Sequence, residues 1–244
     1  MRIRQSIIRW ILGRITFFSM IVILLVSTIE YINAYDTKSS AILEEKKQHI
    51  AEKIKIESQI FMLAEKNLDV FEDEFLRLYS SETVLSDEDF WHYFFRDDNG
   101  AIRLKKQYYE GVYDKDGSYV YAMSGFIGNN QSVNDPALQR KILLTYKVIA
   151  RLGPAWSKQF PDLTASFPEN VGILFYPGEP WGLNADANLR MNDASVFKSV
   201  MPESNPRRKS IWTGLYYDET AKEWVVSYMK PIDYNGQYVV SPGH

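Results

Sequence analysis

The sequence predicts an α+β protein with an N-terminal transmembrane helix, a long stalk helix and an antiparallel sheet. Three observations support this prediction: an apolar run at 15–29, a charged run at 36–79 that is poor in Gly and Pro, and short aromatic and β-branched runs after residue 100. Runs of these three kinds are typical of membrane spans, helices and strands, respectively. With 244 residues, the chain has room for one large domain or two small ones.

The charge is unevenly distributed along the chain. Residues 1–14 carry Arg2, Arg4, Arg9 and Arg14 and no acidic residue. Because the formal net charge is −3, the remaining residues carry about seven net negative charges. A basic tip on an acidic body does not indicate a nucleic-acid partner, which needs positive charge across the folded domain. The absence of cysteine excludes disulfides, thiolate catalysis and cysteine-bound zinc.

The apolar run ITFFSMIVILLVSTI at 15–29 is long enough to cross a bilayer, together with Ile-Leu-Gly at 11–13. The arginines before it and Glu30 after it place the N-terminus in the cytoplasm and the bulk of the chain outside the inner membrane. We expect a cytoplasmic basic tip at 1–14 and a transmembrane helix at 15–35. A cleaved signal peptide has the same pattern and is the alternative.

Residues 36–80 are expected to form one long stalk helix, broken at most once. Their apolar residues mostly keep to one helix face. These residues are Ile50, Ile54, Phe61, Leu68, Phe71, Phe75 and Leu78. An ordinary core helix and a stalk that pairs with a second copy both produce this pattern. The highly charged first half favours a homodimer through the stalk helix, and the more apolar second half favours packing on its own domain.

Residues 81–244 are expected to form the extracytoplasmic module. A short helix should begin after Ser86, which can cap it, because three acidic residues follow at the positive helix end. The Asp-Asp-Asn-Gly run at 97–100 has the residue types that are typical of a turn. It lacks the ligand spacing of a calcium loop, so we expect no metal there.

A hairpin and a long helix follow. Aromatic runs at 108–113 and 119–123 flank Asp-Lys-Asp-Gly at 114–117, which predicts a hairpin. An Asp-Pro start and a Gly-Pro stop at 153–154 predict a helix from 135 to about 152.

The stretch between residues 155 and 206 is rich in proline and aromatic residues. We expect a short strand at 171–176 between proline-bounded loops. Residues 181–206 are expected to form an irregular lid with one short helix near 194–200. Loops of this length inside a compact domain are usually functional or mobile.

The run Ile-Trp-Thr-Gly-Leu-Tyr-Tyr-Asp at 211–218 opens a predicted meander, with further strands at 224–229 and 237–240. The expected pocket binds a small organic solute between aromatic walls and one charged group. The candidate ligand-binding residues are Trp212, Tyr216, Tyr217, Asp218, Tyr121 and Trp181, with Trp156 as a further aromatic.

Asp218 could hold an ammonium group by charge-assisted hydrogen bonds, with the rings adding cation–π attraction. The alternative for Asp218 is a turn cap toward Thr220, and the alternative for each tyrosine is a place in the core.

Motifs for catalysis are missing from the sequence. The three histidines, His49, His92 and His244, have no metal-ligand spacing. There is no Walker loop, no dinucleotide fingerprint and no nucleophile elbow. We therefore expect no enzyme, no cofactor and no metal.

The C-terminal run resembles the W-S-x-P-Y-x-D segment of Cache sensor domains, whose sheet is PAS-like. The matching residues are Trp212, Thr213, Leu215, Tyr216, Tyr217, Asp218, Lys230, Pro231, Ile232, Asp233, Asn235, Gly236 and Gly243. The resemblance implies that Asp218 contacts the amine of an amino-acid ligand. The R-x-W-Y element that holds the ligand carboxylate in this family does not stand before Trp212.

The resemblance also implies a role. Cache relatives sense a ligand outside the cell and relay it through the long helix and the membrane span to a diguanylate cyclase or histidine kinase output. Because the sequence ends at His244, the module at 81–244 is expected to be C-terminally incomplete. The alternative from another class is a membrane-anchored interaction or scaffold protein whose aromatic strands only form its core.

Overall fold

The computed structural model describes residues 2–81 and 86–244, without the side chains of residues 2–6, 8 and 9. The side chains of Arg2, Arg4 and Arg9, predicted to form most of the basic tip, therefore lie outside the described residues. The contacts within the chain define two units, one that ends at Gln59 and one at Ile60–His244. Helix α1 (Arg2–Tyr79) supplies residues to both units.

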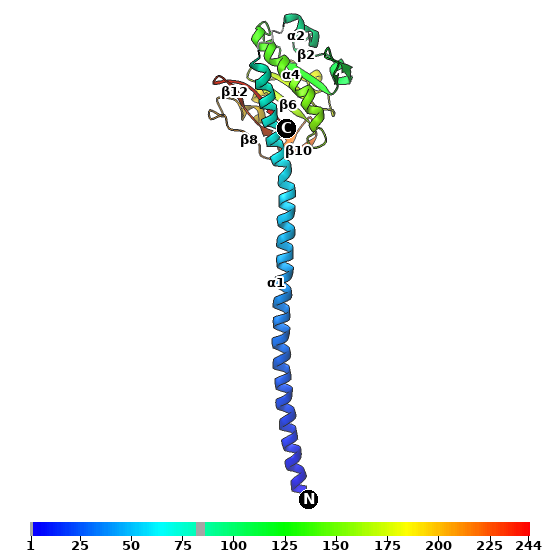
Figure 1. Ribbon diagram of the computed structural model, residues 1–244, viewed down its shortest axis with the longest axis vertical. Helices are drawn as coiled ribbons and strands as arrows, with labels where there is room; N and C mark the ends of the chain where they lie inside the picture. The colour runs from blue at the N-terminus through cyan, green and yellow to red at the C-terminus, as the bar shows by residue number, and fades with distance from the viewer. Residues whose placement is uncertain (1, 82–85) are drawn as a thin grey trace. The chain divides into compact units, whose positions relative to one another are not determined.

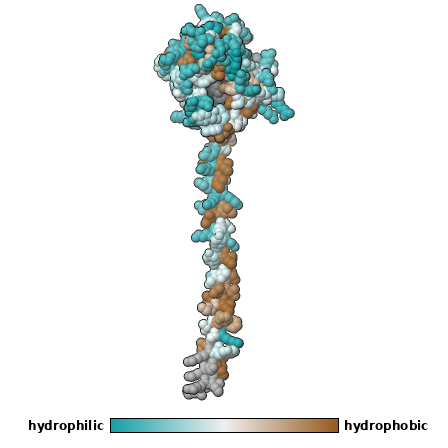
Figure 2. Space-filling model, turned by 180° about the vertical axis from the view of Figure 1, so that it is seen from behind, coloured by the Kyte–Doolittle hydropathy of each residue, from teal (hydrophilic) through white to brown (hydrophobic). Residues whose placement is uncertain are grey.

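The first unit is a single stretch of helix. Almost all of its described side chains are exposed, and it includes an 18-residue window with a mean hydropathy of 2.1. By length and composition this window is able to cross a membrane, a property that signal sequences share. Figure 2 shows its apolar surface in brown. Helix α1 continues to Tyr79 without the break that the sequence allowed for.

The second unit contains the sheet. Its helical elements after α1 are α2 (Asp87–Tyr93), α3 (Gln107–Glu110), α4 (Pro136–Trp156), α5 (Trp181–Asn184), the 3-10 helix η1 (Met191–Asp193) and α6 (Ser195–Lys198). Its strands are β1 (Phe94–Arg96), β2 (Ile102–Leu104), β3 (Val112–Tyr113), β4 (Tyr119–Val120), β5 (Met123–Ile127), β6 (Leu163–Phe167), β7 (Val171–Phe175), β8 (Ile211–Trp212), β9 (Tyr216–Asp218), β10 (Glu223–Val225), β11 (Tyr228–Met229), β12 (Ile232–Tyr234) and β13 (Gln237–Gly243).

Among the described residues, nine strands form one antiparallel sheet in the order β1-β2-β5-β7-β6-β13-β11-β8, with β12 paired to β13. Strands β9 and β10 form a separate hairpin, as do β3 and β4. The central strands β5 and β7 are buried along their whole length. The α+β fold class with its long apolar N-terminal helix and antiparallel sheet is therefore confirmed.

Two helices cover one face of the sheet. Figure 1 shows α4 beside the last turns of α1, and Arg151 of α4 makes an ion pair with Glu74 of α1. Apolar side chains of both helices and the sheet form one core cluster, in which Phe71, Phe75 and Phe167 are fully buried. Burial of side chains of this size is the main source of stability in such a core.

The long loop after β7 covers the opposite face. Its residues Ala185, Ala187 and Met191 form a second buried cluster with Phe126 of β5. Strand residues alternate between faces. Phe126 therefore faces the loop, while its neighbour Ile127 belongs to the helix-side cluster.

Several local predictions are confirmed. Ser86 forms a capping box with Asp89 at the start of α2. The Asp-Gly turn joins β3 and β4, with Gly117 at a φ of 82° that suits glycine. Helix α4 begins after Asp135, whose side chain accepts a hydrogen bond from the backbone N–H of Ala137. A short helix, α6, lies where it was expected in the loop.

Other predictions are wrong at particular residues. Residues 107–110 form helix α3 rather than a strand, because one helical turn packs the Tyr108 ring against Tyr93 and Tyr146. Helix α4 runs past its predicted stop to Trp156 and carries Pro154 in its last turn. Strand β6 was not predicted, because it is short and of mixed composition; it is held between β7 and β13.

The predicted strand at 224–229 is interrupted. Residues 223–225 pair with β9 in the separate hairpin, whereas Tyr228 and Met229 pair with β8 in the main sheet. Ser227 lies between the two pairings and donates its backbone N–H to Thr213 Oγ1.

Candidate functional site

The predicted run at 211–218 lies at one edge of the main sheet and in the β9–β10 hairpin. Trp212 is partly buried, with its ring 4.9 Å from Phe61 and 4.8 Å from Tyr228, measured between centroids. Its Nε1 donates a hydrogen bond to Glu65 Oε1. Trp212 therefore packs on helix α1.

The other predicted residues of this run lie on the hairpin. Tyr216 shares a hydrogen bond of 2.8 Å with Ser227. Tyr217 is exposed and packs against Trp224 across the hairpin. Because side chains alternate along a strand, Tyr216 and Asp218 point away from the face of Tyr217.

Asp218 caps the hairpin turn. Its Oδ1 accepts hydrogen bonds from the backbone N–H groups of Thr220 (2.7 Å) and Ala221 (3.0 Å). The turn cap that the sequence offered as an alternative is therefore present. Among the described residues Oδ2 of Asp218 accepts no hydrogen bond, so one oxygen is left for another partner.

Asp162 is a neighbour of Asp218 that the sequence did not reveal. It directly precedes β6, and burial followed by the negative charge of Asp218 raises its pKa to about 7. Tyr176 directly follows Phe175, which pairs with Leu163, the residue directly after Asp162. Burial, and then the charges of Asp162 and Asp218, raise the pKa of Tyr176.

Tyr216 belongs to the same group. Burial raises its pKa, and the charges of Asp218 and Asp162 act in the same direction, while the hydrogen bond with Ser227 acts against them. We call these four residues, Asp162, Tyr176, Tyr216 and Asp218, the Asp162–Asp218 cluster. The structure thus joins two of the predicted residues with two that only tertiary contacts could identify. A desolvated carboxyl group beside a second carboxylate is a common feature of functional sites.

His244 adjoins this cluster through the backbone of Asp162. Its Nδ1 donates to the Asp162 carbonyl oxygen at 2.9 Å, and its ring stacks on Phe160 at 4.3 Å between centroids. Trp156, the further aromatic candidate, packs against the His244 ring. Burial lowers the pKa of His244 to about 4, so the ring is neutral at pH 7.

Tyr121 and Trp181 lie in two other places. The Tyr121 ring packs edge-on against Phe175, the last residue of β7. Trp181 opens the long loop and packs against Phe126, on the sheet face that the loop covers. The structure therefore places Tyr121 against Phe175 and Trp181 under the loop.

The loop at 181–206, predicted to be a lid, is fastened to the sheet by Arg103. This buried side chain donates from Nη1 to the Gly182 carbonyl and from Nη2 to the Ala185 carbonyl, each at 2.8 Å. Its Nε donates to Asp97, also at 2.8 Å. Since Trp181, Ala185 and the side chains beyond them fill this face, the loop is an integral part of the core.

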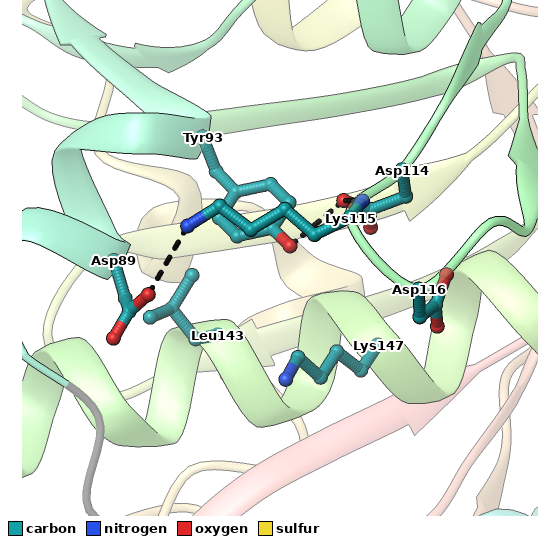
Figure 3. A pocket seen from close by; sticks show the side chains of 7 residues that line it. All are labelled: Asp89, Tyr93, Asp114, Lys115, Asp116, Leu143 and Lys147. Atoms are coloured by element: carbon teal, nitrogen blue, oxygen red, sulfur yellow. Dashed lines mark hydrogen bonds and ion pairs between the residues drawn. The ribbon is translucent and has the colours of Figure 1, made fainter.

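A pocket of about 100 Å³ lies between α2, the β3–β4 turn and α4 (Figure 3). Its lining consists of the carboxylates of Asp89, Asp114 and Asp116, the ammonium groups of Lys115 and Lys147, and the apolar surfaces of Tyr93 and Leu143. Across the described residues, no group of three or more His, Asp or Glu side chains is placed to hold a metal ion. The lining of this pocket is therefore mainly polar and charged.

The fold and these sites define an α+β domain that follows an apolar helix. No family model matches the chain, and no curated protein matches it. The chain is similar to the sensory domain of the Campylobacter jejuni chemoreceptor Tlp3 (CcmL), with 16% identity, a TM-score of 0.29, and coverage of 39% of this chain and 40% of that one. It is also similar to the ligand-binding domain of the same receptor in complex with L-norvaline, with 17% identity, a TM-score of 0.26, and coverage of 44% and 45%. The chain spans less than half of these domains, and the likeness does not identify its ligand.

Proposed function

We propose that the chain is the membrane-anchored, extracytoplasmic sensory region of a signal-transduction receptor of the Cache type. Helix α1 supports this proposal, because the helix with the apolar stretch also supplies Leu68, Phe71 and Phe75 to the core of the second unit. A rearrangement of that core would displace the helix. A ligand can drive such a change only if it binds the two arrangements with different affinity.

The Asp162–Asp218 cluster is the observation that supports the ligand class. Two carboxyl groups lie close together, and burial and the charge of Asp218 raise the pKa of Asp162 to about 7, so Asp162 is only partly ionised at neutral pH. A cationic group beside them would favour the ionised form of Asp162 and bond to the free oxygen of Asp218. Tyr176 and Tyr216 offer aromatic faces for cation–π attraction. The proposed ligand is therefore an amine or an amino acid bound through its ammonium group.

The topology and assembly are part of the same proposal. The four arginines at 1–14 and Glu30 favour a cytoplasmic N-terminus in an inner membrane and an extracytoplasmic second unit. Exposed apolar residues continue along α1 beyond the membrane stretch, and they include Ile42, Ile50 and Ile54. A homodimer through this part of α1 would cover them.

To test this proposal, the thermal unfolding midpoint of the full chain in lipid nanodiscs is measured with added amines, amino acids and carboxylates. A ligand at a hundred times its dissociation constant adds about 2.7 kcal/mol of stability. We expect a saturable rise in the unfolding midpoint with an amine or amino acid, and its loss in Asp218→Asn. Asp98→Asn is the matched control, because Asp98 is an exposed aspartate in another turn. A folded Asp218→Asn variant with full affinity would place the site elsewhere.

Proton release gives a second readout of the same site. Because ammonium binding favours ionised Asp162, binding near pH 6 should release a proton from the wild-type protein. Calorimetry in buffers of different ionisation enthalpy measures this release. Asp162→Asn should bind without releasing a proton, and an unchanged release in this variant would exclude Asp162 from the site.

An interaction or scaffold role is the second candidate, and the outer face of the β9–β10 hairpin favours it. Leu215, Tyr217, Trp224 and Val226 are all exposed on this face, and Tyr217 pairs directly with Trp224. Contiguous exposed apolar surface often marks a protein interface. Absence of any solute-induced stabilisation in the screen, together with a monomer-to-dimer change lost in Trp224→Ser, would favour this role over the sensor.

A further inference from the structure

The pocket between α2, the β3–β4 turn and α4 has two kinds of charged groups, and its carboxylates are largely satisfied. Asp114 accepts hydrogen bonds from the hydroxyls of Tyr93 (2.8 Å) and Tyr146 (3.2 Å) and from the backbone N–H of Lys115. Asp89 accepts from the backbone and hydroxyl of Ser86 and forms an ion pair of 3.2 Å with Lys115. These bonds hold the carboxylates within the protein's own network.

The ammonium groups retain unused hydrogen-bond donors. Among the described residues, Lys115 Nζ makes one hydrogen bond, to Asp89, which leaves two of its three N–H groups. In the part of the chain that the structure describes, Lys147 makes no hydrogen bond or ion pair. Figure 3 shows the two lysine side chains running in the same direction across the pocket, one from the hairpin turn and one from α4. The free N–H groups of these two lysines can therefore donate to a negatively charged hydrogen-bond acceptor.

The walls limit the size and charge of that acceptor. Leu143 and the Tyr93 ring form an apolar side, and the volume of about 100 Å³ admits only a small group. The lining holds three carboxylates and two ammonium groups, so its formal charge is −1. A doubly charged anion would meet stronger repulsion from Asp89 and Asp116 than a singly charged one.

We propose that this pocket binds a small monocarboxylate, separately from the Asp162–Asp218 cluster. The carboxylate oxygens accept hydrogen bonds from Lys115 and Lys147, and a short alkyl group packs on Leu143 and the Tyr93 ring. The bound carboxylate therefore joins the hairpin turn, which carries Lys115, to α4, which carries Lys147.

The experiment uses the full chain in nanodiscs and acetate as the probe, with sodium chloride at the same ionic strength as reference. We expect a saturable rise in the unfolding midpoint with acetate, from which a dissociation constant follows. Lys147→Met keeps the side-chain length and removes the charge, and it should weaken acetate binding at least tenfold. Lys158→Met is the matched control, because Lys158 is an exposed lysine just beyond the end of α4.

The outcomes are distinct from those of the proposed sensor site. Asp218→Asn should leave acetate affinity unchanged. An acetate effect that is not saturable, that survives in Lys147→Met or that disappears in Asp218→Asn would overturn the proposal. Tighter binding of inorganic phosphate than of acetate would overturn the assignment to a monocarboxylate.

Discussion

The indole Nε1 of Trp212 donates a hydrogen bond to Oε1 of Glu65 at 2.9 Å, although the two residues are 147 positions apart in the chain. Glu65 belongs to α1, and Trp212 ends β8 next to the hairpin that carries Asp218. The ring of Trp212 also packs on Phe61 of α1. Trp212 therefore links the proposed ligand site to the helix that would relay its signal.

The first prediction concerns the strength of this link. Trp212→Phe keeps an aromatic ring but removes the donor, and Glu65→Ala removes the acceptor. Each change should cost about 0.5–1.5 kcal/mol in the free energy of unfolding, since one hydrogen bond is lost. Urea titrations of the two single variants and the double variant measure the coupling. If the two costs simply add, the hydrogen bond contributes nothing to stability.

The second prediction concerns pH, because Asp162 and His244 titrate in opposite senses. Folded Asp162 keeps its proton to about pH 7, whereas the unfolded carboxyl group loses it near pH 3.9, so ionisation of Asp162 lowers stability as the pH rises between these values. Unfolded His244 gains a proton below about pH 6.5, but the folded ring does so only near pH 4. His244 therefore lowers stability as the pH falls. The two effects largely cancel between about pH 4 and 6.5.

Single variants should expose each slope. Asp162→Asn lacks the carboxyl group whose ionisation lowers the stability of the wild type as the pH rises. The stability of this variant relative to wild type should therefore increase with pH in this window, by up to about 1.4 kcal/mol per pH unit. His244→Phe should show the reverse trend while keeping the ring contact with Phe160. Unfolding free energies measured at pH 4.5, 5.5 and 6.5 test both slopes. Flat differences for both variants would mean that neither group titrates abnormally.

The sequence was informative where structure is local. Ser86 directly precedes α2, so the sequence predicted its role as a cap, although the reciprocal bond from Asp89 was seen only in the structure. The Asp-Gly turn predicted its hairpin because the turn and the strands are also neighbours in sequence. The Asp218 cap is also local, and it was stated as an alternative. None of these three predictions required knowledge of the fold.

Tertiary pairing decided the features that the sequence did not reveal. Asp162 becomes unusual only because the β6–β7 pairing and the β9–β10 hairpin bring it beside Tyr176 and Asp218. In the same way, Arg103 looks like an ordinary strand arginine until the loop 79 residues later reaches it. Long-range contacts of this kind leave no periodic pattern in a single sequence.

The third prediction concerns how Arg103 holds the loop. Arg103→Met should leave the Gly182 and Ala185 carbonyls and Asp97 without their donor and cost about 3 kcal/mol. Arg103→Lys should recover only part of this loss, because one ammonium group cannot reach three separate acceptors as the guanidinium does.

Hydrogen exchange measures the effect of Arg103 directly. Amide exchange at residues 181–191 should rise more than tenfold in Arg103→Met. Arg96→Met is the control, because Arg96 is exposed and its hydrogen bond to the Gly100 carbonyl is long, at 3.3 Å. Unchanged exchange in the loop would mean that apolar packing alone holds it.

The last prediction concerns the contact between α4 and the sheet at Gly153. A Cβ atom at this position would lie 2.5 Å from Cγ of Phe175 and 2.6 Å from its Cβ, distances at which the fully buried ring must move. Helix propensity alone would make Gly153→Ala stabilising by about 1 kcal/mol. Overpacking costs about 1–3 kcal/mol and acts against it, so the variant should be less stable than wild type.

Two further variants, Gly214→Ala and Phe175→Leu, separate the general effect of replacing glycine from the cost of overpacking. Gly214 has open space around its Cβ position, so Gly214→Ala should be neutral or slightly stabilising. In the double variant Gly153→Ala with Phe175→Leu, the smaller side chain gives the new methyl group room, and the cost should be less than the sum of the single costs. Denaturant unfolding of wild type, Gly214→Ala, Gly153→Ala, Phe175→Leu and the double variant measures these costs. A Gly153→Ala variant more stable than wild type would show that α4 can shift away from the sheet without loss.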